Sequence, residues 1–176
     1  MGDARVELLR SRVRDIADFP KPGILFKDIT PLLADVDAFR ASIQLFVERL
    51  DGAAVDAVIG IESRGFMFGA ALADKLGVGF VPVRKPGKLP AATYRAEYAL
   101  EYGTDSLEIH RDALREGERV VIVDDLIATG GTAAATAELV ARCGGEVVAF
   151  AFVISLGFLN GQEKLVPHRV VSLLEY

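Results

Sequence analysis

The chain has 176 residues, of which 51% are hydrophobic, and its 20 Lys and Arg against 25 Asp and Glu give a formal net charge of −5. This length predicts a single domain, residues 1–176, because domains most often have ~100–150 residues. Folding of a chain of this size buries roughly 70% of its unfolded surface, which is enough for a hydrophobic core. The apolar content excludes a disordered chain. The acidic balance argues against a protein that coats DNA or RNA, although a local phosphate site needs no net positive charge.

The sequence has no clear targeting or membrane-spanning signal, and we therefore expect a cytoplasmic protein with no membrane association. The single cysteine, Cys143, permits no internal disulfide. The first residues carry Asp3, Arg5 and Glu7 and lack the apolar core of a signal peptide. The most apolar run, residues 147–159, is shorter than the ~20 residues of a membrane-spanning helix.

The first third of the chain predicts two helices separated by an irregular segment. Four apolar residues recur at spacings of 3, 4 and 3, which is one helical face: Val6, Leu9, Val13 and Ile16. The prolines and glycine of residues 19–23 should end this helix. Residues 24–33 have no clear period, and Asp37 is the expected cap of a second helix with apolar residues from 39 to 50.

The remaining two thirds alternate between apolar strands and helices. Strands are expected at residues 57–61, 79–83, 120–123, 146–154 and 169–174. Helices are expected at residues 67–76 and 132–143. Continuous apolar strands that alternate with helices predict an α/β fold with a mostly parallel sheet covered on both faces. Residues 88–110 differ, since turn residues at 103–105 divide a polar segment that predicts a hairpin or mobile flap.

One strand end carries an unusual combination of carboxylates and glycines. The strand at 120–123 runs directly into Asp124 and Asp125, and a Thr-Gly-Gly-Thr turn at residues 129–132 precedes the next helix. Inward N–H groups of the turn, the helix N-terminus and two hydroxyls would form a cradle for a phosphomonoester. Adjacent carboxylates suit sugar hydroxyls, or Mg²⁺ reached through water. A sugar with a terminal phosphate satisfies both halves, and the alternative is a plain capped helix beside surface acids.

Two further strand ends bear cations. Residues 60–65 have the outer glycine spacing of a P-loop, but Phe66 and Met67 stand where Lys and Ser or Thr are required, which excludes that class of ATPase. Arg64 in this turn is placed to hold a second phosphate group, and residues 84–88 form a third, basic loop. The alternatives are a surface arginine and a solvated basic loop. In a parallel sheet the three loops would converge on one rim.

Residues 121–132 resemble the phosphoribosyl pyrophosphate (PRPP) signature of the type I phosphoribosyltransferases. Four further blocks are similar to the members of that family that use adenine: residues 19–31, 62–66, 84–90 and 98–103. The resemblance implies a type I phosphoribosyltransferase-like fold with an N-terminal hood (about 1–36) and a flexible flap (about 88–110). It also implies a homodimer that converts adenine and PRPP into AMP and pyrophosphate, with Mg²⁺ bound mainly through PRPP and water rather than directly by the protein.

The resemblance assigns PRPP binding to residues of three loops: Ser63, Arg64, Lys85, Asp124, Asp125, Ala128, Thr129, Gly130, Gly131 and Thr132. By this likeness Asp124 and Asp125 meet the ribose hydroxyls, and residues 128–132 hold the 5′-phosphate. Arg64 and Lys85 bind pyrophosphate and take part in catalysis. Ser63 contributes its backbone, and the Glu62–Ser63 peptide is a candidate for a cis bond, which is rare without proline.

For adenine, the resemblance implies stacking by Phe26, recognition of the base edge by the backbone of Leu25 and Lys27, and a cover from Leu156. Judged from the residues alone, Phe26 and Leu156 would be ordinary core side chains.

The flap would bring Glu101 and Tyr102 into catalysis, the first for proton handling and the second to orient the departing group. The alternative for Glu101 is a charged flap residue in solvent. Two other functions stay open: transfer to another purine base, and a non-catalytic regulator that senses PRPP. Three observations argue against the regulator: Lys85, Glu101 and Tyr102 are present, the N-terminal helix is too short for a helix-turn-helix module, and the chain is acidic.

Overall fold

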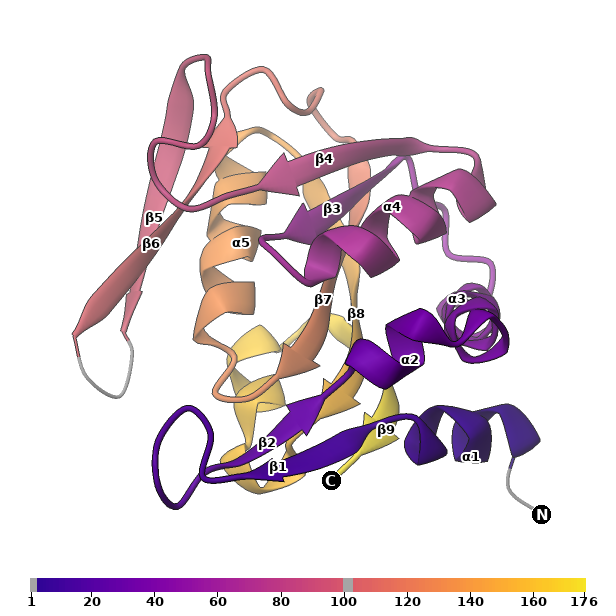
Figure 1. The fold of residues 1–176 in the computed structure, drawn as a ribbon. Coiled ribbons are helices and arrows are strands. Elements are labelled where there is room, and N and C mark those ends of the chain that lie inside the picture. Colours follow the sequence, from indigo (N-terminus) through magenta and orange to yellow (C-terminus); the bar gives the residue numbers. More distant parts are fainter. Residues whose placement is uncertain (1–2, 100–102) are drawn as a thin grey trace. The chain divides into compact units, whose positions relative to one another are not determined.

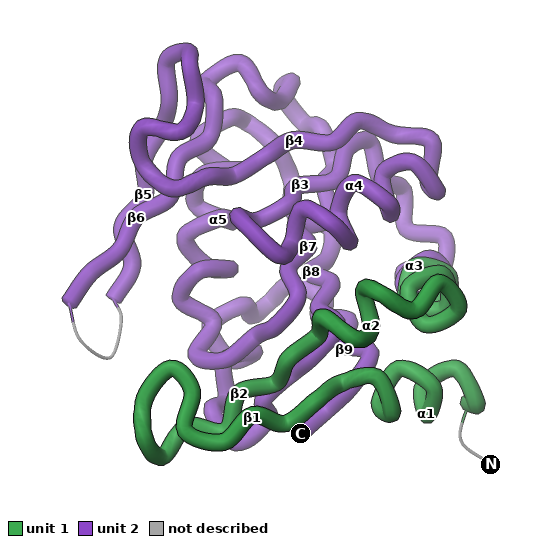
Figure 2. Tube along the Cα trace, in the orientation of Figure 1, with its two compact units in different colours: residues 1–45 green, residues 46–176 purple. Residues whose placement is uncertain are grey.

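The computed structural model describes residues 3–99 and 103–176 (Figure 1). The chain divides into two compact units, Met1–Leu45 and Phe46–Tyr176, which are coloured separately in Figure 2 and are called unit 1 and unit 2 below. The single domain expected for residues 1–176 stays a prediction. None of the helices in the described ranges is long and apolar enough to cross a membrane.

Unit 1 combines short helices with a two-stranded hairpin. Its elements are α1 (Ala4–Ser11), β1 (Arg14–Ala17), β2 (Leu25–Asp28), α2 (Thr30–Ala34) and the greater part of α3 (Val36–Leu50). The strands pair antiparallel, with Ile16 opposite Phe26. The expectation that the first helix extends to Ile16 is therefore wrong. The helix ends at Ser11, and Ile16 pairs across the hairpin instead of continuing the helical face.

Capping of α3 also differs from the expectation. Asp35 Oδ1 accepts hydrogen bonds of 3.0 Å from the N–H groups of Asp37 and Ala38. Asp35 thus caps the helix, because its side chain meets donors of the first turn that have no partner within the helix. Asp37, the expected cap, lies in that first turn.

Unit 2 is built on a five-stranded parallel sheet of order β4-β3-β7-β8-β9. Its strands are β3 (Ala57–Ile61), β4 (Gly79–Val83), β7 (Arg119–Ile127), β8 (Glu146–Ser155) and β9 (Arg169–Glu175). Its helices are α4 (Gly65–Leu76), α5 (Gly131–Arg142) and the 3-10 turns η1 (Gly157–Leu159) and η2 (Gly161–Leu165). The α/β class and the parallel sheet are confirmed.

The connections of this sheet place a ligand site at a definite point. From β3 the chain crosses through α4 to β4, whereas from β7 it crosses through α5 to β8, in the opposite direction along the sheet. Because such crossovers are right-handed, α4 and α5 cover opposite faces. The strand order reverses between β3 and β7. Ligands of open α/β sheets bind outside the carboxyl ends of the strands at such a switch point.

Side-chain alternation on β3 agrees with this arrangement. Ala57, Ile59 and Ile61 belong to one buried core cluster with Leu139 of α5. Gly60 points to the other face, where a Cβ on it would collide with the Phe80 ring. Both faces of the strand are therefore covered, which explains why its sequence is continuously apolar rather than alternating.

The polar segment forms the predicted hairpin. Strands β5 (Thr93–Ala99) and β6 (Thr104–His110) pair antiparallel from Thr93 opposite His110 to Ala99 opposite Thr104. β5 lies along α5 (Figure 1). Near the open end of the hairpin, the Tyr94 ring lies 4.8 Å from Arg142 Cζ and 5.2 Å from Arg111 Cζ, as cation–π contacts. The flexibility expected of this flap stays a prediction.

Candidate active site

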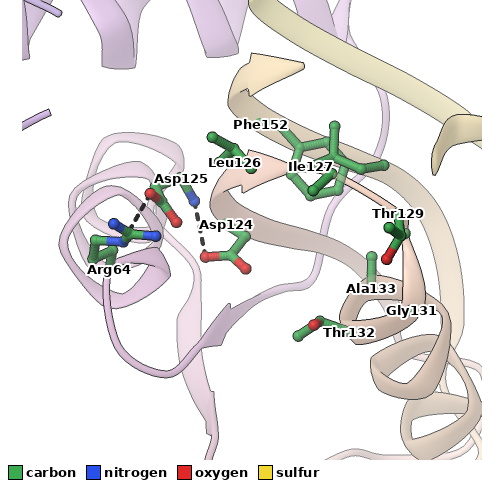
Figure 3. A pocket seen from close by; sticks show the side chains of 12 residues that line it. Arg64, Asp124, Asp125, Leu126, Ile127, Thr129, Gly131, Thr132, Ala133 and Phe152 are labelled. Carbon is green, nitrogen blue, oxygen red and sulfur yellow. Dashed lines mark hydrogen bonds and ion pairs between the residues drawn. The ribbon is translucent and has the colours of Figure 1, made fainter. Parts of the chain in front are cut away.

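A cavity of about 220 Å³ lies at the carboxyl end of β7 and the start of α5 (Figure 3). Most of its lining comes from residues predicted for PRPP: Arg64, Asp124, Asp125, Ala128, Thr129, Gly130, Gly131 and Thr132. Leu126, Ile127, Ala133 and Phe152 complete it. β7 continues past both aspartates, because it pairs with β8 as far as Ile127 opposite Ser155. The prediction that this strand ends at residue 123 is therefore wrong, and both carboxylates belong to the strand itself.

The turn before α5 depends on the backbone freedom of glycine. Gly130 has a φ of 77°, in the left-handed region that residues with a Cβ rarely adopt. It is the N-cap of α5, and none of the described side chains caps this helix end. The first N–H groups of a helix have no partner within it, and the helix dipole places positive charge there. The turn therefore has the donors that a phosphate group requires.

Gly161 of η2 packs against the backbone of this turn. No role for it was predicted from the sequence. A Cβ built on Gly161 would overlap the carbonyl oxygen of Ala128 and would lie 2.8 Å from the amide nitrogen of Gly130. A Cβ on Gly130 would in turn overlap the carbonyl oxygen of Gly161. The two backbones are thus in direct contact. The only signal in the sequence is an Asn-Gly turn, which gives no indication of its distant partner.

The two adjacent carboxylates differ in their environments. Asp125 is only 4% exposed, and its Oδ2 receives no hydrogen bond from any described residue, although Arg64 Nε lies 2.9 Å away as an ion pair. Asp124 Oδ1 accepts a 2.9 Å hydrogen bond from the Asp125 N–H. Burial, followed by the charge of Asp125, raises the pKa of Asp124 well above its usual range. The pair is suited to receive hydroxyl donors or a cation.

Close packing between α4 and β7 brings Arg64 to the aspartates. A Cβ on Gly65 would lie 2.6 Å from the Val123 carbonyl oxygen and 3.0 Å from Asp124 Oδ1, so the missing side chain permits the approach. The peptide joining Glu62 and Ser63, just before this helix, is cis, as predicted.

Lys85 does not line this cavity and lies in the loop after β4. Glu62 Oε2 connects the two loops, since it accepts hydrogen bonds from Lys85 N at 2.9 Å and Arg84 Nε at 3.2 Å. The Lys85 ammonium donates to Tyr98 Oη at 2.9 Å and forms an ion pair with Asp105. Burial alone would lower the pKa of Lys85, but these contacts outweigh it and the pKa is raised. The hydrogen bond from Lys85 lowers the pKa of Asp105.

The residues predicted for adenine in unit 1 lie on the β1–β2 hairpin. Leu25 is 53% exposed, and the rings of Phe26 and Phe19 meet edge to face at 5.1 Å. Lys27 is buried, and its Nζ donates to Asp15 at 2.7 Å, so its ammonium group is engaged within this hairpin. A cavity of about 250 Å³ is lined by Arg14, Ile16, Phe19, Phe26 and Asp28.

The other predicted contacts lie in unit 2 or outside the described residues. Leu156 follows β8 directly, is half-buried, and donates from its N–H to the Ile127 carbonyl at 3.0 Å. Glu101 and Tyr102 lie outside the described residues. Within the ranges 3–99 and 103–176, no group of three or more His, Cys, Asp or Glu side chains could hold a metal ion. The paired aspartates fit a cation that keeps water and substrate oxygens as its other ligands.

Taken together, the glycine-rich turn and the carboxylate pair at the switch point of a parallel sheet define an α/β protein that binds a sugar phosphate. Residues 28–173 match the model of the phosphoribosyl transferase domain. The adenine phosphoribosyltransferase of Christiangramia forsetii is 56% identical over 168 residues, which cover 96% of this chain and 98% of that protein.

Solved structures of adenine phosphoribosyltransferases are also similar to this chain. The crystal structure of adenine phosphoribosyltransferase from Thermoanaerobacter pseudethanolicus has a TM-score of 0.95 and 56% identity, and covers 97% of this chain and 99% of that one. The Saccharomyces cerevisiae enzyme, complexed with D-2,5-dideoxy-2,5-imino-altritol 1,6-bisphosphate and adenine, has a TM-score of 0.93 and 42% identity, with 97% and 99% coverage. The chain belongs to the phosphoribosyltransferase family, in its adenine phosphoribosyltransferase branch.

Proposed function

We propose that the protein transfers the 5-phosphoribosyl group of PRPP to adenine and so forms AMP and pyrophosphate. The observation that carries the proposal is the phosphate turn beside two carboxylates, in a chain 56% identical to an adenine phosphoribosyltransferase. The yeast relative was crystallised with adenine and a bisphosphate, which supports the same pair of ligand types here.

In the proposed reaction the residues of unit 2 hold PRPP from both ends. The turn at residues 128–132 takes the 5′-phosphate, and the carboxylates of Asp124 and Asp125, which line the same cavity, accept from the ribose hydroxyls. Arg64 and Lys85 meet the pyrophosphate. A nitrogen of adenine forms the new bond to the anomeric carbon while the bond to the pyrophosphate oxygen breaks and that oxygen takes the electron pair. The adenine nitrogen then loses its proton, a step for which Glu101 stays the proposed acceptor, and Tyr102 is proposed to orient pyrophosphate.

Mg²⁺ is the proposed cofactor, and the donor set of Asp124 and Asp125 fits it. When bound, Mg²⁺ would supply charge neutralisation for the pyrophosphate. The aspartates would contact it through water while they hold the ribose hydroxyls, so that most of its ligands come from PRPP and water.

A panel of bases tests the choice of substrate against both alternatives. Adenine, hypoxanthine, guanine and xanthine are each incubated with PRPP and Mg²⁺, and product nucleotide is quantified. We expect product from adenine alone and no product once a chelator is added. A faster reaction with another base would reassign the base, whereas PRPP binding with no product from any base would favour the regulator.

Adenine recognition is assigned to Leu25, Phe26 and Lys27 of unit 1, with Leu156 kept as a proposed contact. The partly exposed Phe26 ring beside an open cavity supports a stacking role.

Phe26→Ala should raise KM for adenine by roughly ten-fold, because loss of an aromatic ring from a base stack costs about 1–3 kcal/mol. KM for PRPP should change little. Steady-state kinetics with each substrate varied gives both values, and Phe39→Ala, which removes a half-buried ring of α3, is the matched control. An equal rise in both KM values for Phe26→Ala would remove Phe26 from the base site.

We also propose that the protein is a homodimer in the cytoplasm. The family likeness is the support for both proposals. Light scattering coupled to gel filtration measures the mass of the assembly directly.

A further inference from the structure

Lys85, in the proposed pyrophosphate site, has its charge partly neutralised by Asp105 of the β5–β6 hairpin. Its Nζ donates to Tyr98 Oη at 2.9 Å, is paired with Asp105 Oδ2, and lies 5.5 Å from the centre of the Tyr98 ring. Tyr98 Oη also donates to Asp105 Oδ2 at 3.3 Å. The side chains of Lys85 and Asp105 are 38% and 33% exposed, so that an anion in solvent can reach the ammonium.

The backbone around Lys85 is held by groups other than Asp105. Glu62 Oε2 accepts from the Lys85 N–H, and Arg84 exchanges two backbone hydrogen bonds with Glu108, at 3.0 and 2.7 Å. Gly87 N donates to Glu108 Oε2 at 3.1 Å. Asp105 is therefore bonded to the end of the Lys85 side chain and not to its loop. A change at Asp105 should alter the charge at the ammonium and leave the loop in place.

Tyr98 connects this cluster with the phosphate turn. A Cβ built on Gly131, the first residue of α5, would lie 3.5 Å from Tyr98 Cδ2 and 3.5 Å from the Ala99 carbonyl oxygen. The tyrosine thus contacts Lys85 through its hydroxyl and the start of α5 through its ring edge. The Lys85–Asp105 pair consequently belongs to the neighbourhood of the sugar-phosphate site and not to a remote part of the surface.

We infer that Asp105 is a positioning residue that holds the Lys85 ammonium and offsets its charge, so that pyrophosphate binds at this site more weakly than the bare lysine would allow. The inference rests on the proposed function, because it takes Lys85 as a pyrophosphate ligand. An ammonium has three N–H donors, and Tyr98 and Asp105 use two of them. Pyrophosphate must therefore use the third donor or displace Asp105, and in both cases it meets a carboxylate of its own sign.

Such an arrangement favours release of the product. A reaction that ends with pyrophosphate bound to cations turns over only if that anion can leave. As pyrophosphate departs, the Asp105 carboxylate can again accept a hydrogen bond from the Lys85 ammonium. The same carboxylate keeps Lys85 in one place before PRPP binds.

The test is a double-mutant cycle on pyrophosphate affinity, measured by titration calorimetry with Mg²⁺-pyrophosphate as the probe. Asp105→Asn should tighten pyrophosphate binding about two- to five-fold, the range typical of one partly exposed charge. KM for PRPP should fall to a similar extent, and KM for adenine should stay unchanged. In a Lys85→Met background the same Asp105→Asn change should have no effect.

Glu97→Gln is the matched control, since Glu97 lies on the same hairpin, is exposed, and gives the same change in net charge. If Asp105→Asn lowers the melting temperature, Asp105→Ala replaces it in the cycle. Unchanged or weaker pyrophosphate binding in Asp105→Asn would overturn the inference. It would also be overturned if Asp105→Asn tightened binding equally in the Lys85→Met background, or if Glu97→Gln tightened binding as much as Asp105→Asn. Failure of the proposed function is seen separately, as a wild-type protein that forms no AMP.

Discussion

Gly161→Ala should lower kcat/KM for PRPP by about 100-fold, because displacement of a binding group by about 1 Å commonly has an effect of that size. The added methyl group overlaps the Ala128 carbonyl oxygen and lies 2.8 Å from the Gly130 nitrogen. Neither backbone atom can rotate away as a side chain would. The turn must therefore shift, and the donors for the 5′-phosphate shift with it. Initial rates of AMP formation at varied PRPP concentration measure this loss.

Gly157→Ala is the control for this experiment. Gly157 lies in the neighbouring 3-10 turn, and the nearest atom to an added Cβ there is the Tyr176 carbonyl oxygen at 3.7 Å, which is an ordinary contact. It should keep near wild-type kcat/KM. Calorimetric melting of both variants separates a local shift from global unfolding. A folded Gly161→Ala variant with wild-type KM for PRPP would show that the turn does not depend on η2.

Asp124→Asn should reduce kcat/KM by roughly 10- to 100-fold, as expected for loss of one hydrogen bond to a charged group, and should stabilise the ligand-free protein at pH 8. The pKa of Asp124 is raised in the folded state. For such an acid the stabilising contribution is complete below the unfolded pKa of about 4 and is lost as the pH rises through the folded value. Asparagine cannot ionise, so the variant avoids this loss.

Melting temperatures between pH 4 and pH 8 test the sign of this effect. The difference in melting temperature between Asp124→Asn and wild type should grow as the pH rises. Asp56→Asn is the control of opposite sign: hydrogen bonds from Arg119 lower the pKa of Asp56 to about 2, so this variant should lose stability at neutral pH. If Asp124→Asn melted below wild type at pH 8, burial would not be what governs the ionisation of Asp124.

The parallel sheet was predictable because its signals are local. Residues 57–61 and 120–123 are continuously apolar, as strands covered on both faces must be, and glycines and prolines mark the ends of the elements. Strand β1 was not predictable in this way. Its four residues are largely exposed, so no alternation marks them, and the strand exists through its pairing with β2 across the hairpin. The same pairing explains why Ile16 was misassigned to a helix.

In the candidate site, too, the features formed by one continuous segment were predictable and those formed by distant segments were not. The turn at residues 128–132 and the adjacent aspartates are one continuous segment, so the residue types and their order were enough to predict a phosphate and sugar site. Gly161 and Asp105 were not predictable, because Gly161 contacts the turn before α5 and Asp105 pairs with Lys85 in the loop after β4. Contacts between segments far apart in the chain depend on the tertiary fold, and a single glycine or aspartate carries no local sign of them.

The transferase activity itself is measured as AMP formed from adenine and PRPP by the wild-type protein, with pyrophosphate quantified in the same samples. We expect AMP and pyrophosphate in equal amounts, dependent on both substrates. A well-folded protein that binds PRPP and produces neither compound would contradict the proposed activity. Pyrophosphate release without AMP would reduce the activity to hydrolysis and would equally contradict transfer to the base.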